Sequence, residues 1–426
     1  MDSMQTNMLH LMGLRRDHED GILCDILSRL PARDAARTSA LSTRWRRLWR
    51  SVPLVLADAH LKHTGPPPPP VSEIDQVDGL GGVLRRAVDG TRDVASAVSR
   101  ALAAHPGPFR SVHVTCTRMD AHHAELALWL QLLAAKGVQE LVLVYQASKL
   151  DAGVRLPATL FRCSSLTCLY IGFLRFPDVA TIQRAGAFPH LRELGLCSLV
   201  MGVRDLALLL DRCPVLENLE IVGHRELVRL RVASHSLRCV ELCESVVEEI
   251  TVEHAARLER LMFWEICGAG TKVSPKNMVR SVRVLGIQCE TTIHKPPGML
   301  NPKFLQQTGP IDCLQKHIKK VIIREFRIHR SELDFVKFIA ERGQVLEKIV
   351  IVLAQSYSSS ADRLRSSMRT FMASVKLANE DCKVIVCESP FPSDGTAWCF
   401  QGAFNMSKDP FDVSQCSNSG ASCRAA

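Results

Sequence analysis

The 426-residue sequence lacks any apolar run of the roughly twenty residues needed to span a bilayer. Its longest apolar stretches, residues 126–135 and 348–354, are much shorter, and we expect no membrane partner. The N-terminus also lacks the basic start and long apolar run of a secretory segment. With 16 cysteines in such a chain, we expect a reducing compartment, the cytoplasm and/or the nucleus.

Sequence motifs of catalysis are also missing. The chain contains no GxSxG nucleophile elbow, no GxxxxGK[ST] phosphate loop and no HExxH zinc helix. Its neighbouring carboxylates, such as Glu19-Asp20 and Glu248-Glu249, are adjacent in sequence, so a helix or strand directs them apart. We expect no catalytic residues, no cofactor and no enzymatic activity.

Metal sites are not predicted either, because no two ligand pairs have matching zinc-type spacing. The near neighbours are Cys163 and Cys168, Cys239 and Cys243, and Cys382 and Cys387. Each pair falls within or beside an apolar, strand-like run, which favours buried thiols. His122, His123 and Glu125 begin a helical pattern, where a solvated first turn is the ordinary interpretation.

Composition predicts a mostly globular chain with more than one structural unit, since hydrophobic residues make up 46% of 426 positions. The net charge of +9 comes from 53 basic and 44 acidic residues spread along the chain. That excess favours acidic partners or anions only weakly.

Residues 17–58 predict a module of three short helices. Apolar residues recur at helical spacing up to Leu30, and Pro31 cannot continue the first helix. Asp34 precedes an alanine-rich second helix, and Ser42 and Thr43 offer hydroxyl caps for a third. A module this small cannot bury all its large side chains, so we expect several to remain available to another protein.

This segment resembles the F-box, above all in ILSRLPARDAARTSALSTRWRRLWRSVP, which is similar to the plant version. The resemblance implies docking onto the Skp-family linker of a cullin-RING ubiquitin ligase. It assigns the contact, or support of the contact, to the following residues: Ile22, Leu23, Ile26, Leu27, Leu30, Pro31, Leu41 and Trp45. A generic helical hairpin with a leucine core is the alternative, and the length of the match disfavours it.

The first helix departs from the family pattern. Most members have Leu-Pro where this chain has His18-Glu19, and Gly21 replaces a usual helix former. Glycine in a helix interior costs about 0.5 to 1 kcal/mol relative to alanine, so we expect reduced linker affinity. Seven arginines also lie in the module, but their regular place in the family motif and the lack of a stacking platform argue against nucleic acid.

A proline- and glycine-rich linker is predicted over residues 59–90, including the extended GPPPPP at 65–70. Helices are then expected over residues 94–104 and 124–137, and strands over 109–116 and 138–145. This alternation begins an α/β region.

The next signal is a repeat. The pattern aliphatic-x-x-aliphatic-x-aliphatic recurs at intervals of 21 to 28 residues, beginning at Val138, Leu166, Leu191, Leu216, Leu237, Leu258 and Val282. Phrases such as FPHLRELGL and CPVLENLEI resemble plant F-box proteins with leucine-rich repeats. We therefore expect a solenoid over residues 91–300, with the leucines in the core and the residues between them on a concave sheet.

Those intervening positions are the predicted target contacts. They are Glu193, Gly195, Asn218, Glu220, Arg260, Met262, Trp264 and Gln288. Trp264 is the favoured anchor because tryptophan is common at interface centres. The alternative, that it packs under a neighbouring loop, stays open.

Two more matches begin at Ile318 and Leu346, where the pattern changes to strand, helix, strand, helix and strand. Ser331 is expected to cap the first of these helices and Gly343 to end it, while the second covers about residues 361–377. Residues 311–388 resemble the plant FBD domain, and the resemblance implies no activity. The polar residues 400–426 are expected to form a disordered tail.

The predicted fold class is α/β: a three-helix F-box, a leucine-rich-repeat solenoid and a C-terminal α/β module. The leading hypothesis is a substrate-recognition adaptor whose F-box binds the linker and whose repeats capture an unknown target protein. A ligase-independent scaffold that binds through its repeat surface is the alternative. A small-molecule receptor is a third hypothesis, for which no pocket can be identified in the sequence.

Overall fold

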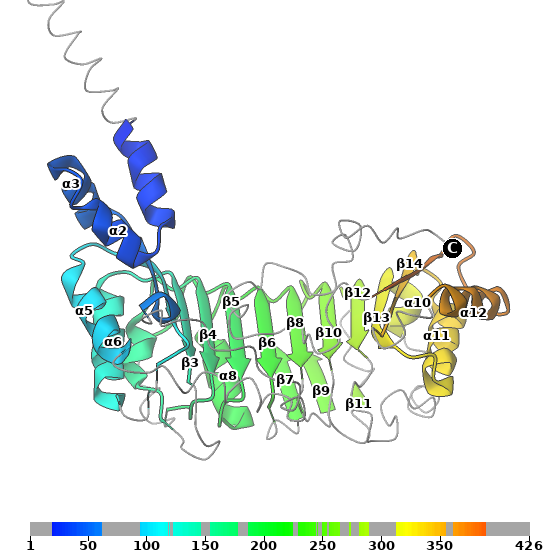
Figure 1. Ribbon diagram of the computed structural model, residues 1–426. Coiled ribbons are helices and arrows are strands. Elements are labelled where there is room, and N and C mark those ends of the chain that lie inside the picture. Colours follow the sequence, from blue (N-terminus) through cyan, green and yellow to red (C-terminus); the bar gives the residue numbers. More distant parts are fainter. Residues whose placement is uncertain are drawn as a thin grey trace, which may run out of the picture. The chain divides into compact units, whose positions relative to one another are not determined.

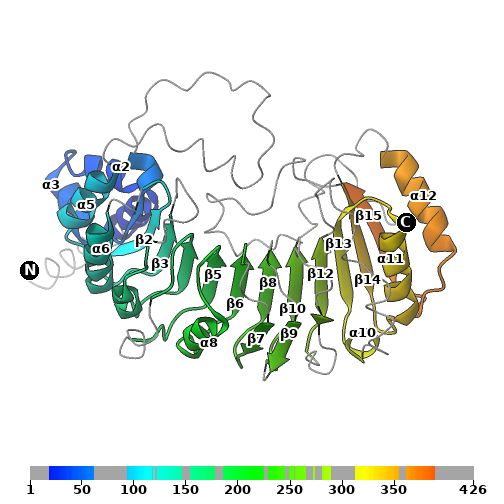
Figure 2. The ribbon, with the colours of Figure 1, turned by 90° about the horizontal axis from the view of Figure 1, so that it is seen from below.

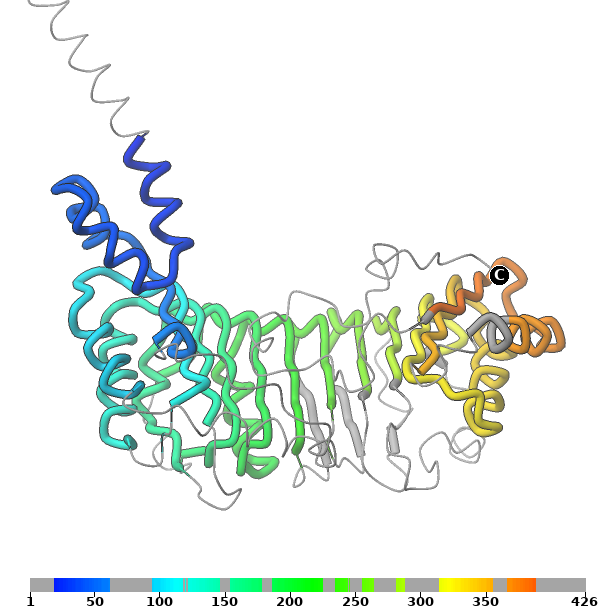
Figure 3. Tube along the Cα trace, viewed as in Figure 1, coloured from blue at the N-terminus to red at the C-terminus, as the bar shows by residue number. Residues whose placement is uncertain are grey.

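The computed structural model describes most of the chain in segments (Figure 3). These are residues 19–61, 94–117, 119, 122–145, 154–177, 186–224, 229–243, 245, 249–253, 255–264, 272–273, 281–288, 312–354 and 361–388. The predicted linker, apart from its first residues, and the predicted tail lie outside these ranges. Two compact units divide the chain after His190, and each is treated by itself below.

The first unit begins with three short helices (Figure 1). Residues 19–29 form the first, α2 covers Ala32–Thr38, and α3 covers Thr43–Ser51. Pro31 separates the first two helices, as predicted, but α2 begins two residues before Asp34, which lies in its first turn. The predicted cap of α3 is confirmed, because the backbone N–H of Trp45 donates to the Ser42 hydroxyl.

A parallel sheet follows in the same unit, with strand order β1-β2-β3-β4. Its strands are β1 Leu54–Ala57, β2 Phe109–Val114, β3 Glu140–Val144 and β4 Cys168–Gly172. The connections contain the 3-10 helices η1 Asp58–Leu61 and η4 Ala158–Arg162, and the helices α5 Val94–Ala104 and α6 His123–Ala135. Figure 2 shows α5 and α6 side by side on one side of β2 and β3.

The second unit continues with parallel strands in the order β5-β6-β8-β10-β12-β13-β14-β15. They are β5 Glu193–Cys197, β6 Asn218–Val222, β8 Cys239–Cys243, β10 Arg260–Trp264, β12 Val284–Gln288, β13 Lys320–Phe326, β14 Lys348–Leu353 and β15 Lys383–Glu388. A second parallel sheet, in the order β11-β9-β7, contains β7 Arg229–Ala233, β9 Glu249–Glu253 and β11 Lys272–Val273.

Helices of the second unit are α8 Val203–Asp211, α10 Asp312–Lys316, α11 Arg330–Arg342 and α12 Ala361–Ala373. Gly343 ends α11 as predicted, but Ser331 does not cap it. His329 is the N-cap residue instead, because the buried Glu332 carboxylate accepts from the N–H groups of Arg327 and His329, both at 2.9 Å. Helix α12 ends four residues before the predicted Leu377.

The repeat pattern predicts the strands closely. Each of its nine matches begins two residues before a strand, from Val138 before β3 to Leu346 before β14. Every one of these first aliphatic residues is buried. The stacked cores of successive repeats therefore continue through β13 and β14 of the C-terminal region without a break in the parallel pairing of β12, β13 and β14.

A row of charges crosses the second unit at the residue that follows each first aliphatic position. Its members are Arg192, Glu217, Arg238, Glu259, Arg283, Lys319 and Glu347. The N–H of each donates to the carbonyl of the one before. Ion pairs join Arg192 to Glu217, Arg238 to Glu259 at 3.2 Å, and Lys319 to Glu347 at 2.6 Å. Charges that alternate in sign, except between Arg283 and Lys319, thus accompany the backbone ladder from repeat to repeat.

Candidate protein-docking face

Three large aliphatic side chains of the helical module are exposed. Ile22 and Ile26 are four residues apart on the first helix, with 52% and 44% of their surface exposed, and Leu41 before α3 is 69% exposed. Residues four apart share one face of a helix. We refer to Ile22, Ile26 and Leu41 as the aliphatic face. Their exposed side chains are available to a partner protein.

The other predicted linker contacts divide by burial. Leu23, Leu30, Pro31 and Trp45 are half-buried. Leu27 is fully buried, so in this chain it supports the face from within and is not available for direct contact. It lies one residue after the exposed Ile26, and successive helical residues point about 100° apart. The first helix thus has one side in the core and one side outward.

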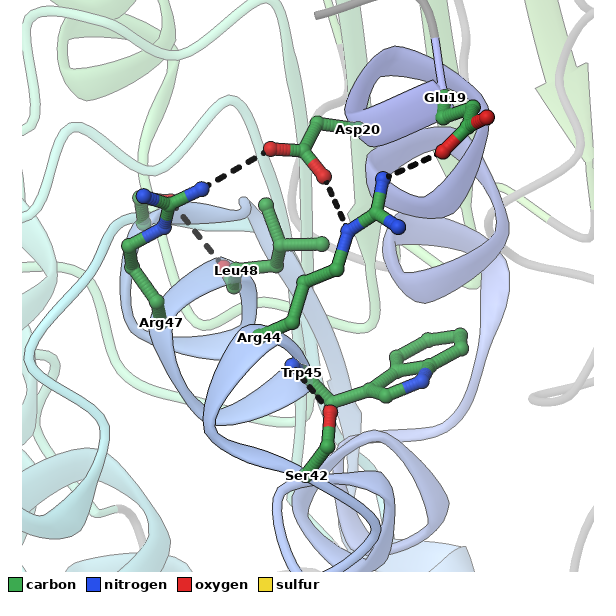
Figure 4. Close-up of polar contacts among 8 residues, drawn as sticks. Glu19, Asp20, Ser42, Arg44, Trp45, Arg47 and Leu48 are labelled. Carbon is green, nitrogen blue, oxygen red and sulfur yellow. Dashed lines mark hydrogen bonds and ion pairs between the residues drawn. The ribbon is translucent and has the colours of Figure 1, made fainter. Parts of the chain in front are cut away.

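Ion pairs attach the beginning of the first helix to α3 (Figure 4). The carboxylate of Asp20 lies 2.7 Å from Nε of Arg44 and 3.0 Å from an outer nitrogen of Arg47. Glu19 adds a contact of 3.2 Å to Arg44. The hydrogen bond from Arg44 lowers the pKa of Asp20. These carboxylates also lie near the positive N-terminal end of the helix, a favourable position for negative charge.

This arrangement gives the unusual first turn a physical role. The Leu-Pro typical of the resemblance is absent from this turn. Its two acidic residues, Glu19 and Asp20, contact arginines 24 to 27 positions away. The sequence displays these opposite charges, but only the packing of the first helix against α3 identifies the pairs. Gly21 beside them has open space where a Cβ would project.

A buried carboxylate connects the module to the sheet of its unit. Asp58 is fully buried and accepts hydrogen bonds from the N–H of Thr115 at 3.0 Å, the N–H of Cys116 at 2.8 Å and the hydroxyl of Thr117 at 2.8 Å. Strand β1 also pairs in parallel with β2. Asp58 was not predicted as a structural residue, since no local pattern in the sequence shows that the loop after β2 folds around it.

Aromatic packing supports the same junction. The Trp49 and His105 rings meet edge-on with centroids 5.1 Å apart, and His105 meets Phe109 in the same way at 5.1 Å. The Lys136 ammonium group donates to the His105 carbonyl and lies 5.7 Å from the Phe109 ring centre. Burial lowers the pKa of His105, so its ring is neutral in the folded chain near pH 7.

One serine and one histidine of this unit form a hydrogen bond. The Ser111 hydroxyl lies 2.9 Å from Nε2 of His113, two residues further along β2. Ser111 is only 2% exposed, and the nearby Asp58 already accepts from the loop after β2. Burial lowers the pKa of His113 to about 4. The pair is therefore part of the interior of the sheet, without an accessible nucleophile.

The histidines considered for metal binding point to different partners. Nδ1 of His122 lies 3.4 Å from Glu125, whereas Nε2 of His123 lies 3.0 Å from the Arg155 carbonyl. Among the described residues, no group of three or more His, Cys, Asp or Glu side chains is placed to hold a metal ion. The same part of the chain contains no helix long and apolar enough to cross a membrane.

The predicted buried thiols are confirmed for Cys163, Cys239, Cys243, Cys382 and Cys387, while Cys168 is half-buried. None of these six thiols takes part in a disulfide bond. Burial raises the pKa of Cys163 to about 12, so its thiol stays protonated.

The predicted target contacts differ in accessibility. Glu193, Asn218 and Arg260 are half-buried at the starts of their strands. Gly195, Glu220 and Met262 are buried, and Met262 has no exposed surface. The side chains of Trp264 and Gln288 lie outside the described residues. The prediction that Met262 and Glu220 are exposed contacts is therefore wrong. Both sides of these strands are buried, as is usual for parallel sheets.

Comparison with known protein families identifies three regions in the order that the structure presents them. The family model of the F-box domain matches residues 20–56. The model described as "FBD-associated F-box protein At5g56370, LRR repeats" matches residues 126–269, and the FBD model matches 306–351. With these three regions in this order, the chain is similar to the plant F-box/FBD/LRR-repeat proteins. Its aliphatic face lies on the F-box, and the charge row crosses its repeats.

Similar family members come from Arabidopsis thaliana. The F-box/FBD/LRR-repeat protein At1g13570 is 29% identical over 243 residues, which are 57% of this chain and 51% of the relative. FBD-associated F-box protein At5g56370 is 30% identical over 203 residues, covering 46% and 40%. F-box/LRR-repeat protein At3g26922 is 28% identical over 294 residues, covering 68% and 85%. The chain thus spans about half the length of the first of these relatives.

Proposed function

We propose that this F-box/FBD/LRR-repeat protein is the substrate-recognition adaptor of an SCF-type cullin-RING ubiquitin ligase. The F-box docks onto the Skp-family linker, and the repeat surface captures a target protein. The protein carries out no bond chemistry itself. It contributes proximity, by holding a target lysine where ubiquitin can be transferred to it. Such a protein acts in the cytoplasm, the nucleus or both.

The exposure of Ile22, Ile26 and Leu41 is the observation that supports linker docking most directly. Helix–helix contacts of this kind bury a few large aliphatic residues at their centre, and those residues contribute most of the binding free energy. The ion pairs of Glu19 and Asp20 with α3 keep the first helix in place without the usual Leu-Pro. Leu23, Leu30, Pro31 and Trp45 complete the proposed contact.

A charge on the aliphatic face tests this docking. The Ile26→Asp variant places a carboxylate against an apolar partner, and we expect linker affinity to fall by at least about thirtyfold, or 2 kcal/mol. Leu128→Asp is the matched control, because Leu128 is 57% exposed on α6 of the same unit and outside the F-box. Titration calorimetry of the full chain with a purified plant Skp-family linker measures both.

Failure of the wild-type chain to bind at micromolar concentration would disprove the ligase adaptor. Equal losses in both variants, or no loss in Ile26→Asp, would show that the aliphatic face is not the contact. The second candidate function is the ligase-independent scaffold, which the atypical first turn of the F-box favours. Failure of the wild-type chain to bind the linker would support it.

For target capture, we propose Glu193 and Arg260 as polar contacts and Trp264 as the anchor. The first two are half-buried at the strand starts of the second unit, and Trp264 ends β10. Large aromatic and long polar side chains of this kind are common at the centres of protein interfaces.

A further inference from the structure

The described segment of residues 19–61, which contains the F-box match, has an excess of positive charge on its surface. Four acidic residues lie at the surface, and all are paired: Glu19 and Asp20 with Arg44 and Arg47, Asp25 with Arg29, and Asp34 with Arg37. The fifth acid, Asp58, is buried and faces the loop after β2.

Three exposed arginines remain. Arg33, Arg46 and Arg50 have no carboxylate partner among the residues that the structure describes. Arg46 and Arg50 are four residues apart on α3, so they lie on the same side of that helix. We call these two residues the arginine face.

The arginine face is distinct from the paired side of α3. At 100° per residue, Arg44, Arg47 and the buried Leu48 share one side, and Figure 4 shows Arg44 and Arg47 directed towards Asp20. Arg46 lies about 160° around the helix from both Arg44 and Leu48, and Arg50 lies between Arg46 and Arg47 on the circumference. Helix α3 therefore uses half of its arginines within the module and presents the other half to solvent.

Guanidinium groups in this position fit carboxylates, which they bind through two parallel hydrogen bonds. Two arginines one helical turn apart match a short acidic stretch. Nucleic acid is the less suitable partner, because single strands require exposed aromatic rings for stacking. The neighbouring tryptophans do not offer them: Trp45 is half-buried, and Trp49 packs against His105.

We propose that the arginine face contacts an acidic segment of the same linker protein that docks on the aliphatic face. The proposal rests on the proposed function, since it needs that linker as the partner. Exposed charges of this kind act mainly on the rate of association, which they raise by electrostatic attraction, and they affect dissociation much less.

The test uses the full chain and a purified plant Skp-family linker, with association and dissociation rates measured between about 50 and 500 mM salt. We expect the double variant Arg46→Ala/Arg50→Ala to associate about three- to tenfold more slowly at low salt, with a shallower dependence on salt. The control, Arg29→Ala/Arg37→Ala, removes two paired arginines of the same module and changes the net charge equally. Its association should slow much less.

Each other outcome has a definite meaning. If the linker binds and the arginine variant behaves like wild type, or like the control, the arginine face is not a contact and the adaptor function stands. If the wild type does not bind the linker, the adaptor function and this proposal both fail. Binding of a fluorescent oligo-dT strand that depends on Arg46 and Arg50, without an effect on linker association, would assign the face to nucleic acid and overturn the proposal.

Discussion

Two histidines whose pKa is lowered by burial contribute to how this chain responds to acid. His113 in the first unit and His224 in the second each have a pKa lowered to about 4, in both cases mainly by burial. In the unfolded chain these groups titrate near pH 6.5. Between those pH values the unfolded state binds more protons than the folded state. The free energy of unfolding is therefore not reduced by these histidines above pH 6.5, and it falls as the pH decreases from 6.5 towards 4.

Between these two pKa values, each histidine is expected to lower the free energy of unfolding by about 1.4 kcal/mol for each unit by which the pH falls. A His224→Asn variant removes one titrating group from the second unit. We predict that its unfolding free energy, measured with urea at pH 7.0, 6.5, 6.0 and 5.5, depends less steeply on pH than that of the wild type. Comparing slopes separates titration from any general loss of packing, and parallel profiles would contradict the role assigned to His224.

Met262 and Glu220 show what residue patterns cannot predict. Alternation along a strand correctly separates Met262 from the core positions Leu261 and Phe263. All three are nevertheless buried. Periodicity identifies the side of a strand, whereas exposure depends on what the rest of the chain places over that side.

At the scale of elements, two glycines have opposite requirements. Gly21 lies in the first helix, and an added Cβ meets no atom within 4 Å. Gly223 follows β6 with φ of +66°, and an added Cβ comes within 2.3 Å of the Ser198 hydroxyl oxygen. Alanine is favoured over glycine in a helix, but a left-handed backbone and a close neighbour both oppose it.

We predict that Gly21→Ala stabilises the first helix by about 0.5 to 1 kcal/mol and that Gly223→Ala destabilises its unit by about 1 kcal/mol or more. Hydrogen exchange of the amides in residues 22–29 measures the first effect, and urea unfolding measures the second. Gly137 serves as an internal comparison, since it has φ of +66° with no atom near a Cβ, and its alanine variant should show the conformational cost alone. A destabilised first helix in Gly21→Ala would contradict this view of the module.

Elements were predictable where each repeat carries its own pattern. Nine aliphatic matches give the starts of nine strands because an aliphatic residue two positions before the strand is buried in every repeat. Strands β7, β9 and β11 were not predicted. They pair with one another in the second sheet. The sequence at β7 (Leu227, Leu230 and Val232) and at β9 (Val247, Ile250 and Val252) has the same aliphatic spacing, but these matches fall between the repeats that recur at 21 to 28 residues.

At the scale of the whole molecule, the question is how the docking module is attached to the repeats of its unit. Asp58 provides a buried connection between the chain after β1 and the loop after β2. Removing its carboxylate leaves the Thr115 and Cys116 amides buried without their acceptor. Each such donor costs about 1 to 3 kcal/mol.

We therefore predict that Asp58→Ala destabilises the first unit by about 2 to 5 kcal/mol. Asp25→Ala, which removes an exposed carboxylate paired with Arg29, should cost less than about 1 kcal/mol. Urea unfolding followed by tryptophan fluorescence measures both, because Trp45, Trp49 and Trp129 lie in this unit. Equal stability of the two variants would show that Asp58 does not hold the junction.

The sequence by itself determined the resemblance to F-box, leucine-rich-repeat and FBD proteins, the order of the three regions and the starts of the repeat strands. Those features depend on local periodicity and on motifs whose residues are close together in the chain. The tertiary structure decided which apolar residues are available to a partner, since Ile22 and Ile26 are exposed while Leu27, the residue after Ile26, is buried. It also decided which charges are paired: Asp20 contacts Arg44 and Arg47, and Arg46 and Arg50 remain outward, because pairing depends on distances that only helix packing sets.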